Sequence, residues 1–235
     1  MAKNFFWLHV KKSGGTSIRT ILQPHYTLVD RAKKPVNFIQ SKPSEYNDIL
    51  NNYRVVLGEY QFKRTLFAKK FLFKEEWAQI ESFAFSREPT DRVLSMYFDL
   101  FKGKFFLKHL IKNRKFLFSN SYRFDFFLDC IVEARESSSI YTPLGLSFST
   151  HTAPMFEDVT DNNGVILLKR IYRLENLAKG VNEVFESCGI TRRQEKIEVR
   201  KNKSKNRKSI SLSSLQIIKI RKIYEKDFEL YENAM

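Results

Sequence analysis

Two short motifs contain the residues best suited to chemistry. The first reads Lys-Lys-Ser-Gly-Gly-Thr-Ser over residues 11–17 and follows an apolar run from Phe5 to Val10. That run is typical of a buried parallel strand, and the apolar spacing after the motif indicates a helix capped by Thr16 or Ser17. Glycines permit a sharp turn, while free amides at a helix start and the Lys12 ammonium favour an anion. The motif predicts a phosphate-binding turn, and the alternative is an ordinary strand-to-helix turn.

The second motif has the same strand-to-helix form. Ser82 to Arg87 reads as a buried strand, and Pro89 fits the first turn of a helix expected over Thr90 to Lys102. Arg87 then lies at the carboxyl end of a strand, and Ser95 lies about two turns into the helix. Ligands bind at this end of open parallel sheets, so the second motif supports the phosphate-binding interpretation of the first.

The two motifs together resemble the nucleotide-binding signatures of the sulfotransferases that use 3'-phosphoadenosine 5'-phosphosulfate (PAPS). The matching residues are Lys12 to Ser17, Arg87, Pro89, Arg92, Ser95 and Tyr97. The likeness is strongest to the carbohydrate branch that includes the heparan sulfate 2-O- and chondroitin enzymes. It implies an α/β, P-loop-like three-layer fold with a central, mainly parallel sheet flanked by helices. It also implies sulfonyl transfer from PAPS to an acceptor hydroxyl by in-line displacement.

The resemblance further implies how the donor is held. The nucleotide would contact Ser13, Gly14, Gly15, Thr16, Ser17, Arg87, Ser95, Lys203 and Ser204. The first five would hold the 5'-phosphate, Arg87 and Ser95 the 3'-phosphate that distinguishes PAPS from ATP, and the last two belong to a loop that closes over the nucleotide. Lys12 would also bind the donor, by contacting its bridging oxygen, and would stabilise the charge that develops as adenosine 3',5'-bisphosphate leaves. No metal is expected.

Two residues are candidates for the general base. A strand is expected over Arg54 to Tyr60, and it ends in Gly58-Glu59 where the family usually has Gly-His. A glutamate can act as a base when partial burial favours its neutral form, although Glu59 could instead pair with a core cation. His151 lies in a segment, 149–155, that resembles the acceptor side of the family site. It is the second candidate, and its alternative role is a hydrogen-bonded loop residue.

Composition points to one globular domain, residues 1–235, with an anionic partner. Hydrophobic residues make up 43% of the chain, and the net charge is +15. The charge fits PAPS and an acceptor that is a glycan or glycolipid, including an acidic one. Only two cysteines are present, Cys130 and Cys188, which favours a reducing compartment and a cytoplasmic location. No stretch approaches the length of a membrane span.

Further elements follow from the residue pattern. Helices are expected over Ser44–Tyr53, Phe126–Ala134, Leu177–Ser187 and Ser213–Tyr231, a helix or helix pair over Lys63–Gln79, and a late buried strand within 164–176. Segments 24–43 and 137–150 read mostly as loop or turn. The Phe- and Lys-rich segment 103–127 is either an amphipathic helix pair or a basic aromatic platform.

Two other functions are compatible with parts of the sequence. A P-loop-like nucleotide kinase would also bind phosphates, but its Gly-Lys-Ser/Thr order is absent because Lys12 precedes the glycines. A basic nucleic-acid or membrane-surface protein could use segments 103–127 and 191–208. That function leaves the paired motifs unexplained, and no specific nucleic acid is expected as a partner.

Overall fold

A parallel three-stranded sheet lies at the centre of the described chain. The computed structural model describes residues 5–25, 38–42, 45–48, 57–100, 120–136, 145–191 and 211–235. The sheet has the order β1 (Phe5–Leu8), β4 (Glu81–Ser86) and β5 (Arg170–Arg173). Phe5 pairs with Glu81, and Phe83 with Arg170. All of β4 is buried, as a middle strand covered on both faces requires.

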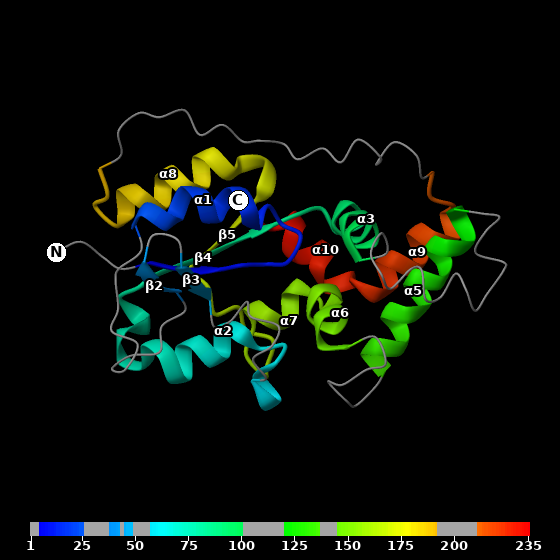
Figure 1. Ribbon diagram of the computed structural model, residues 1–235, viewed down its shortest axis with the longest axis horizontal. Helices are drawn as coiled ribbons and strands as arrows, with labels where there is room; N and C mark the ends of the chain where they lie inside the picture. Colours follow the sequence, from blue (N-terminus) through cyan, green and yellow to red (C-terminus); the bar gives the residue numbers. More distant parts are fainter. Residues whose placement is uncertain are drawn as a thin grey trace.

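Helices cover both faces of the sheet (Figure 1). The helices α1 (Gly15–Leu22) and α8 (Leu177–Ser187) lie on one face and pack on Trp7, Phe83 and Tyr172. On the other face, α2 (Arg64–Phe67) and α7 (Met155–Val159) lie beside the sheet, where Phe6 and Leu8 are buried. Successive strand residues point to opposite faces, which explains why neighbours such as Phe6 and Trp7 join different clusters. The α/β three-layer prediction is confirmed.

A helical layer continues beyond the carboxyl end of the sheet. It contains α3 (Pro89–Leu100), α5 (Asn120–Glu136), α6 (Gly145–Thr152) and α9 (Ser214–Ile223). Their shared core includes Met96, Phe127, Phe148 and Tyr224. After α10 (Glu225–Glu232), the Met235 amide donates to the Ile171 carbonyl of β5 at 2.9 Å. The end of the chain therefore closes one edge of the sheet.

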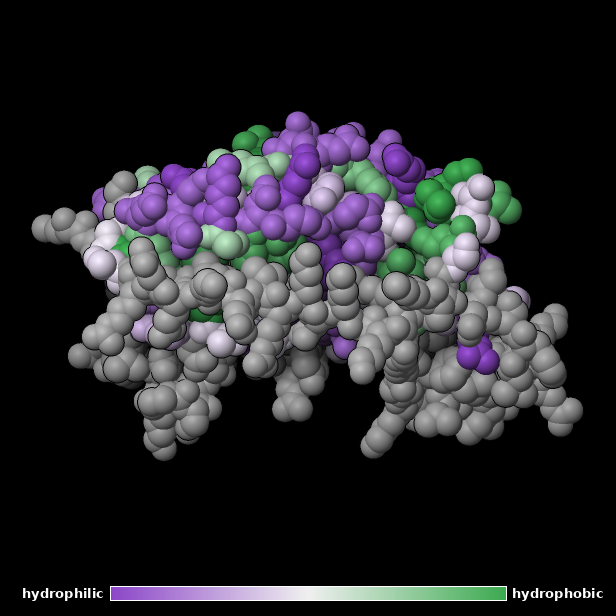
Figure 2. Space-filling view, turned by 90° about the horizontal axis from the view of Figure 1, so that it is seen from above, coloured by the Kyte–Doolittle hydropathy of each residue, from purple (hydrophilic) through white to green (hydrophobic). Residues whose placement is uncertain are grey.

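Shorter elements complete the described chain. They are η1 (Gln23–His25), η2 (Gly58–Tyr60), the π-helix η3 (Ala68–Phe73), η4 (Lys74–Ala78), η6 (Leu174–Asn176) and an antiparallel pair, β2 (Phe38–Lys42) with β3 (Glu45–Asp48). No described helix is long and apolar enough to cross a membrane. The described surface seen from above is largely hydrophilic, with apolar residues at the end where α5 and α9 lie (Figure 2).

Several local predictions were wrong where backbone pairing or an unusual dihedral angle decides the structure. Segment 24–43, expected as loop, contains β2, and the helix expected over Ser44–Tyr53 contains β3, because these two strands bond to each other. The strand expected over Arg54–Tyr60 is a 3-10 turn at its described end, where Gly58 has a φ of 58° that an extended strand excludes.

Two helical predictions also need correction. Segment 137–150, expected as a turn, contains most of α6, which starts at Gly145 with a φ of 82° and buries Phe148. The single helix expected over Ser213–Tyr231 is two helices, because Tyr224 has a non-helical φ of −120°. This break places the Tyr224 side chain in the core, where it is 1% exposed. In segment 103–127, only residues 120–127 are described, and they belong to α5.

Candidate active site

The first motif forms a tight turn between β1 and α1. Lys12 has a φ of 65° and Gly14 a φ of 76°, so two left-handed residues flank Ser13 and reverse the chain within a few residues. A left-handed conformation costs a non-glycine residue such as Lys12 about 1–2 kcal/mol. Backbone strain of this kind concentrates at functional sites because the surrounding structure must hold it in place.

Unbonded donors line this turn. The helix begins at Gly15, so Thr16 and Ser17 lie inside its first turn and neither is the cap that was predicted. The first amides of a helix have no intrahelical acceptor, and they point toward any anion at this end. Ser13 is 1% exposed, and its Oγ has no hydrogen-bond partner in the described structure. Leaving a buried hydroxyl unsatisfied costs about 1–3 kcal/mol, which an acceptor oxygen of a ligand would recover.

The His9 imidazole packs against the start of α1, and it was not predicted from the sequence as part of the site. A Cβ on Gly15 would lie 1.8 Å from the His9 Nε2, so glycine is required where the imidazole meets the helix start. The His9 ring stacks on Trp7, and its Nδ1 lies 3.4 Å from the Arg19 guanidinium, which can only donate. Burial, followed by the charges of Lys11 and Arg19, holds the pKa of His9 well below its ordinary value. A neutral His9 is therefore part of the folded turn.

Arg87 of the second motif makes a hydrogen bond to the first motif. It follows β4 directly, and its guanidinium donates to the Lys12 carbonyl at 3.2 Å and lies 3.4 Å from the Asp91 carboxylate. Because β1 and β4 are adjacent parallel strands, both motifs leave the sheet at the same end. Ser95 lies half-buried on α3, and Pro89 is in the first turn of that helix, as predicted.

A buried ion pair fixes the turn to the C-terminal helix. Arg92 lies 2.9 Å from Asp227, and it also donates to the Lys11 carbonyl at 3.1 Å and the Ala153 carbonyl at 2.6 Å. Asp227 in turn accepts from the amides of Met155 and Phe156. Burial raises the pKa of Asp227, and the Arg92 charge opposes that shift. These contacts give Arg92 a structural role and add Asp227, which the sequence did not single out.

Lys12 and His151 lie close to one aspartate. The Lys12 ammonium is 3.0 Å from the Asp99 carboxylate at the end of α3. The pKa of His151 is lowered mainly by burial, and the charges of Lys11 and Lys12 lower it further while Asp99 raises it. His151 lies on α6 and not in the loop that was expected, because residues 145–152 form a helix. Asp99 had not been predicted as a site residue.

The His151 ring has a defined tautomer. Its Nδ1 lies 2.6 Å from the Ser147 carbonyl oxygen, which can only accept a hydrogen bond. Nδ1 therefore carries the proton, and Nε2 has the lone pair that a general base needs. The lowered pKa keeps this imidazole neutral at neutral pH.

Glu59 lies apart from this cluster. It is exposed on the η2 turn, and in Figure 1 that cyan turn lies beyond α2, well separated from α3. The other predicted residues Lys203 and Ser204 lie outside the described residues. Within the described ranges, no group of His, Cys, Asp or Glu could hold a metal ion.

The chain was compared with protein families, curated proteins and solved structures. A family model described as the sulfotransferase family matches residues 2–233. No match was found among curated proteins or solved structures. The matched region includes both motifs and the strands that position them, from β1 to the C-terminal helix. The chain belongs to the sulfotransferase family.

Proposed function

We propose that this protein transfers the sulfonyl group of PAPS to a hydroxyl group of a carbohydrate acceptor and releases adenosine 3',5'-bisphosphate. Family membership supports sulfonyl transfer in general. The observation that best supports PAPS is the meeting of two strand-end motifs, where Arg87 donates to the carbonyl of Lys12. This arrangement offers two cationic side chains and a helix start to a ligand with two separate phosphate groups.

In this proposal, the phosphate turn holds the 5' side of the donor. The first amides of α1 and the unbonded Ser13 hydroxyl would bind the 5'-phosphate, with Thr16 and Ser17 at its edge. Arg87 and Ser95 would bind the 3'-phosphate, Arg87 through the planar fork that suits phosphate oxygens. Lys203 and Ser204 are proposed to close over the nucleotide.

Lys12 is proposed to act on the leaving group. The acceptor oxygen attacks sulfur, a new S–O bond forms, and the S–O bond to the donor phosphate breaks, so negative charge develops on the phosphate oxygen. A nearby ammonium group stabilises that charge in the transition state. To contact this oxygen, Lys12 would leave the Asp99 carboxylate. The cost in free energy is low, because Asp99 is 53% exposed and an exposed ion pair contributes only about 0.2–1 kcal/mol.

His151 is the better supported of the two candidate bases. Its Nε2 lone pair is available, its pKa is lowered, and its ring lies within the electrostatic influence of Lys12. It would take the proton from the acceptor hydroxyl as the new S–O bond forms. Glu59 remains the alternative and would have to act from an exposed turn.

The cellular location is also part of the proposal. The two cysteines are buried and form no disulfide, which fits a reducing, cytoplasmic location.

A transfer assay tests this assignment. Purified protein is incubated with PAPS carrying radioactive sulfur and a panel of glycans, and labelled product is counted. We expect His151→Asn to lose about 10²–10⁴-fold in turnover while its affinity for adenosine 3',5'-bisphosphate is retained. Glu59→Gln is the matched comparison and should retain activity. Full activity of His151→Asn with loss in Glu59→Gln would reverse the assignment, and transfer of phosphate from ATP with magnesium would favour a kinase.

A further inference from the structure

The helix α9 has an apolar outer face although its inner face is already packed in the core. Ile220 is fully buried on the inner side. On the outer side, Leu215, Ile217 and Ile218 are 78%, 40% and 61% exposed, respectively. The helix is therefore apolar around most of its circumference, which is typical of a helix that is covered on both sides. This outer face needs a partner to cover it.

The exposed apolar residues are concentrated at this end of the molecule (Figure 2). Of the eight large apolar side chains that are exposed in the described part of the chain, three belong to α9 and a fourth is Tyr122 of α5. The two helices lie side by side (Figure 1), and Gln216 of α9 donates to Asp125 of α5 at 2.8 Å. Tyr122 precedes Asp125 by one helical turn. Grouped apolar side chains of this kind mark an interaction surface, whereas scattered ones do not.

Cations lie next to the exposed isoleucines. Arg221 follows Ile217 by four residues, and Lys222 follows Ile218 by four, so each cation shares a helix face with an isoleucine. Both cations are exposed, as is Lys226 one turn after Lys222. None of the three forms an ion pair with another residue of the described chain. The outer face of α9, defined as Leu215, Ile217, Ile218, Arg221 and Lys222, is therefore both apolar and basic.

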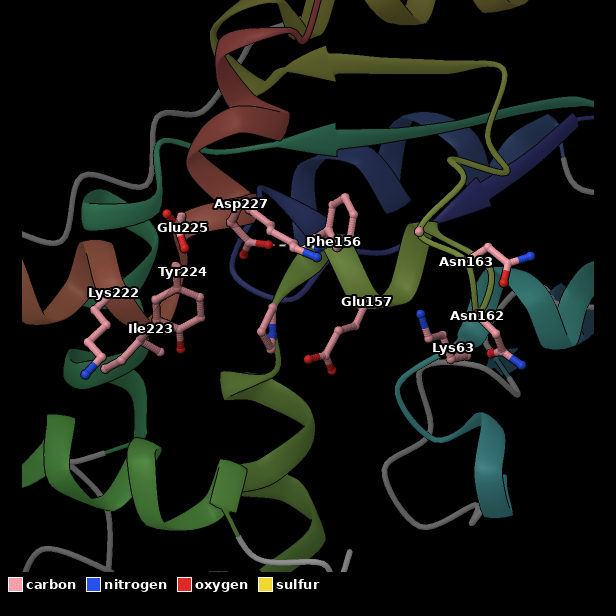
Figure 3. A pocket seen from close by; sticks show the side chains of 13 residues that line it. Lys63, Phe156, Glu157, Asn162, Asn163, Lys222, Ile223, Tyr224, Glu225 and Asp227 are labelled. Carbon is pink, nitrogen blue, oxygen red and sulfur yellow. Dashed lines mark hydrogen bonds between the residues drawn. The ribbon is translucent and has the colours of Figure 1, made fainter.

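Few free acids oppose these cations. Asp125 and Asp129 of α5 face α9, but they bond to Gln216 and Lys219, respectively. Glu225 is exposed at the start of α10. Figure 3 shows Lys222 at one side of the polar cavity where α9 meets α10, a cavity that Lys226 also lines. The local balance is positive, like the net charge of +15 of the whole chain, and it attracts a negatively charged partner.

The chemistry of the face favours a lipid surface over a protein. A second copy of this chain would carry the same charge of +15, so the two copies would repel each other. The energetic centres of protein interfaces are enriched in Trp, Tyr and Arg, and leucine is under-represented in them. Exposed leucine and isoleucine beside lysine and arginine are instead typical of helices that lie in the boundary between lipid headgroups and acyl chains.

We infer that the outer face of α9 docks on the surface of an anionic lipid bilayer. Leu215, Ile217 and Ile218 enter the headgroup region, and Arg221 and Lys222 contact lipid phosphates. With 10 residues, α9 is about 15 Å long, which is half the thickness of the hydrocarbon core, so the helix lies on the bilayer and does not cross it. The inference goes beyond the proposed function and does not depend on it, because no residue of this face belongs to the two nucleotide motifs.

Flotation with lipid vesicles tests the inference. The full chain is mixed with vesicles of about two parts phosphatidylcholine to one part phosphatidylglycerol and, separately, with pure phosphatidylcholine vesicles, and bound protein is measured against lipid concentration. We expect at least about tenfold tighter binding to the anionic vesicles. Leu215→Gln/Ile218→Gln should bind them at least about tenfold more weakly than the wild type, because two apolar side chains no longer enter the interface. The matched control Val165→Gln/Ile166→Gln removes exposed apolar side chains outside α9 and should change binding less than about twofold.

A second pair of variants tests the charges. Arg221→Gln/Lys222→Gln should weaken binding to the anionic vesicles about tenfold or more, because both cations lie near the lipid phosphates. The matched control Lys69→Gln/Lys169→Gln removes two exposed cations outside α9 and should weaken binding less than about threefold, because salt screens distant charges.

The depth of docking gives an independent measurement. Leu215→Trp places an indole on the outer face, whereas the native Trp7 and Trp77 are buried. Its fluorescence should shift to shorter wavelength on anionic vesicles and be quenched by lipids with brominated acyl chains. Unchanged fluorescence in the presence of bound vesicles would overturn the inference.

Two further results would also overturn it. The first is an absence of vesicle binding, and the second is an equal loss in each α9 variant and its control, which would show attraction by net charge alone. A dimer in light scattering that Leu215→Gln/Ile218→Gln abolishes would assign the face to a second copy instead. Urea unfolding and titration with adenosine 3',5'-bisphosphate are run on every variant and should match the wild type. Vesicle binding without bisphosphate binding would refute the proposed function and leave the docking face supported.

Discussion

Mild acid should destabilise the fold through two histidines next to the phosphate turn. His9 and His151 both have pKa values lowered mainly by burial. A lowered folded pKa means that the unfolded chain binds more protons, so stability is present above the unfolded pKa and is lost as pH falls below it. The effect is expected below the ordinary histidine pKa of about 6.5.

The size of the loss follows from proton linkage. For a histidine that stays neutral in the folded state, lowering the pH from 6.5 to 5.5 costs about 1 kcal/mol of unfolding free energy. His9, whose pKa lies well below its ordinary value, contributes up to this amount, and the lowered pKa of His151 adds a further loss of the same sign. His9 accepts from Arg19 through Nδ1 and presses against Gly15, so its protonation would also disturb the start of α1.

Urea unfolding followed by tryptophan fluorescence measures this loss directly. The wild type is compared at pH 6.5 and 5.5 with His9→Gln and His151→Asn, neither of which has a titrating group at the substituted position. Each variant should show a smaller pH dependence than the wild type, with the larger reduction in His9→Gln, because all other titrating groups are shared. A wild-type change below about 0.5 kcal/mol, or variants with the full wild-type change, would refute the assignment of neutral histidines.

Four other substitutions test individual contacts. Lys12→Ala should lose about 10²–10³-fold in turnover and much less in bisphosphate affinity, and equal losses in both would make Lys12 a binding residue. Asp99→Asn should tighten bisphosphate binding by about 1.5–5-fold in calorimetry, because it removes a competing partner of Lys12, and weaker binding would contradict this. Arg87→Ala should remove the preference for adenosine 3',5'-bisphosphate over AMP, and an unchanged preference would place the 3'-phosphate elsewhere. Arg92→Met should lower the free energy of unfolding by about 3–5 kcal/mol, because it leaves the Asp227 carboxylate buried without its cation. The change is measured by urea titration, and a loss below about 1 kcal/mol would show that water reaches and solvates the Asp227 carboxylate.

The sheet could be predicted because its strands are continuous buried runs. β1, β4 and the region of β5 each read as short apolar segments before a turn or helix. The β2 and β3 pair was missed because each strand is short and depends on its partner. The η2 turn and the start of α6 were missed because Gly58 and Gly145 have left-handed dihedral angles that composition does not reveal.

The candidate site was predictable only in part. Lys12 and Arg87 follow buried strands, so topology brings their motifs together. Asp99 was missed because it reads in the sequence as an exposed helix residue. Its position four residues after Ser95 places both residues on one face of α3, and this spacing was the available signal that Asp99 lies near the site. Asp227 was missed because its partner Arg92 is 135 residues away. Contacts between distant segments leave no local pattern.

The most direct test of the central proposal is a calorimetric titration with adenosine 3',5'-bisphosphate, with ATP and AMP in parallel and a chelator present. The bisphosphate carries both phosphate groups that the turn and Arg87 are proposed to bind. We predict tight binding of the bisphosphate and much weaker binding of AMP and ATP. Absence of binding, or a preference for ATP when magnesium replaces the chelator, would contradict the assignment of PAPS as the donor.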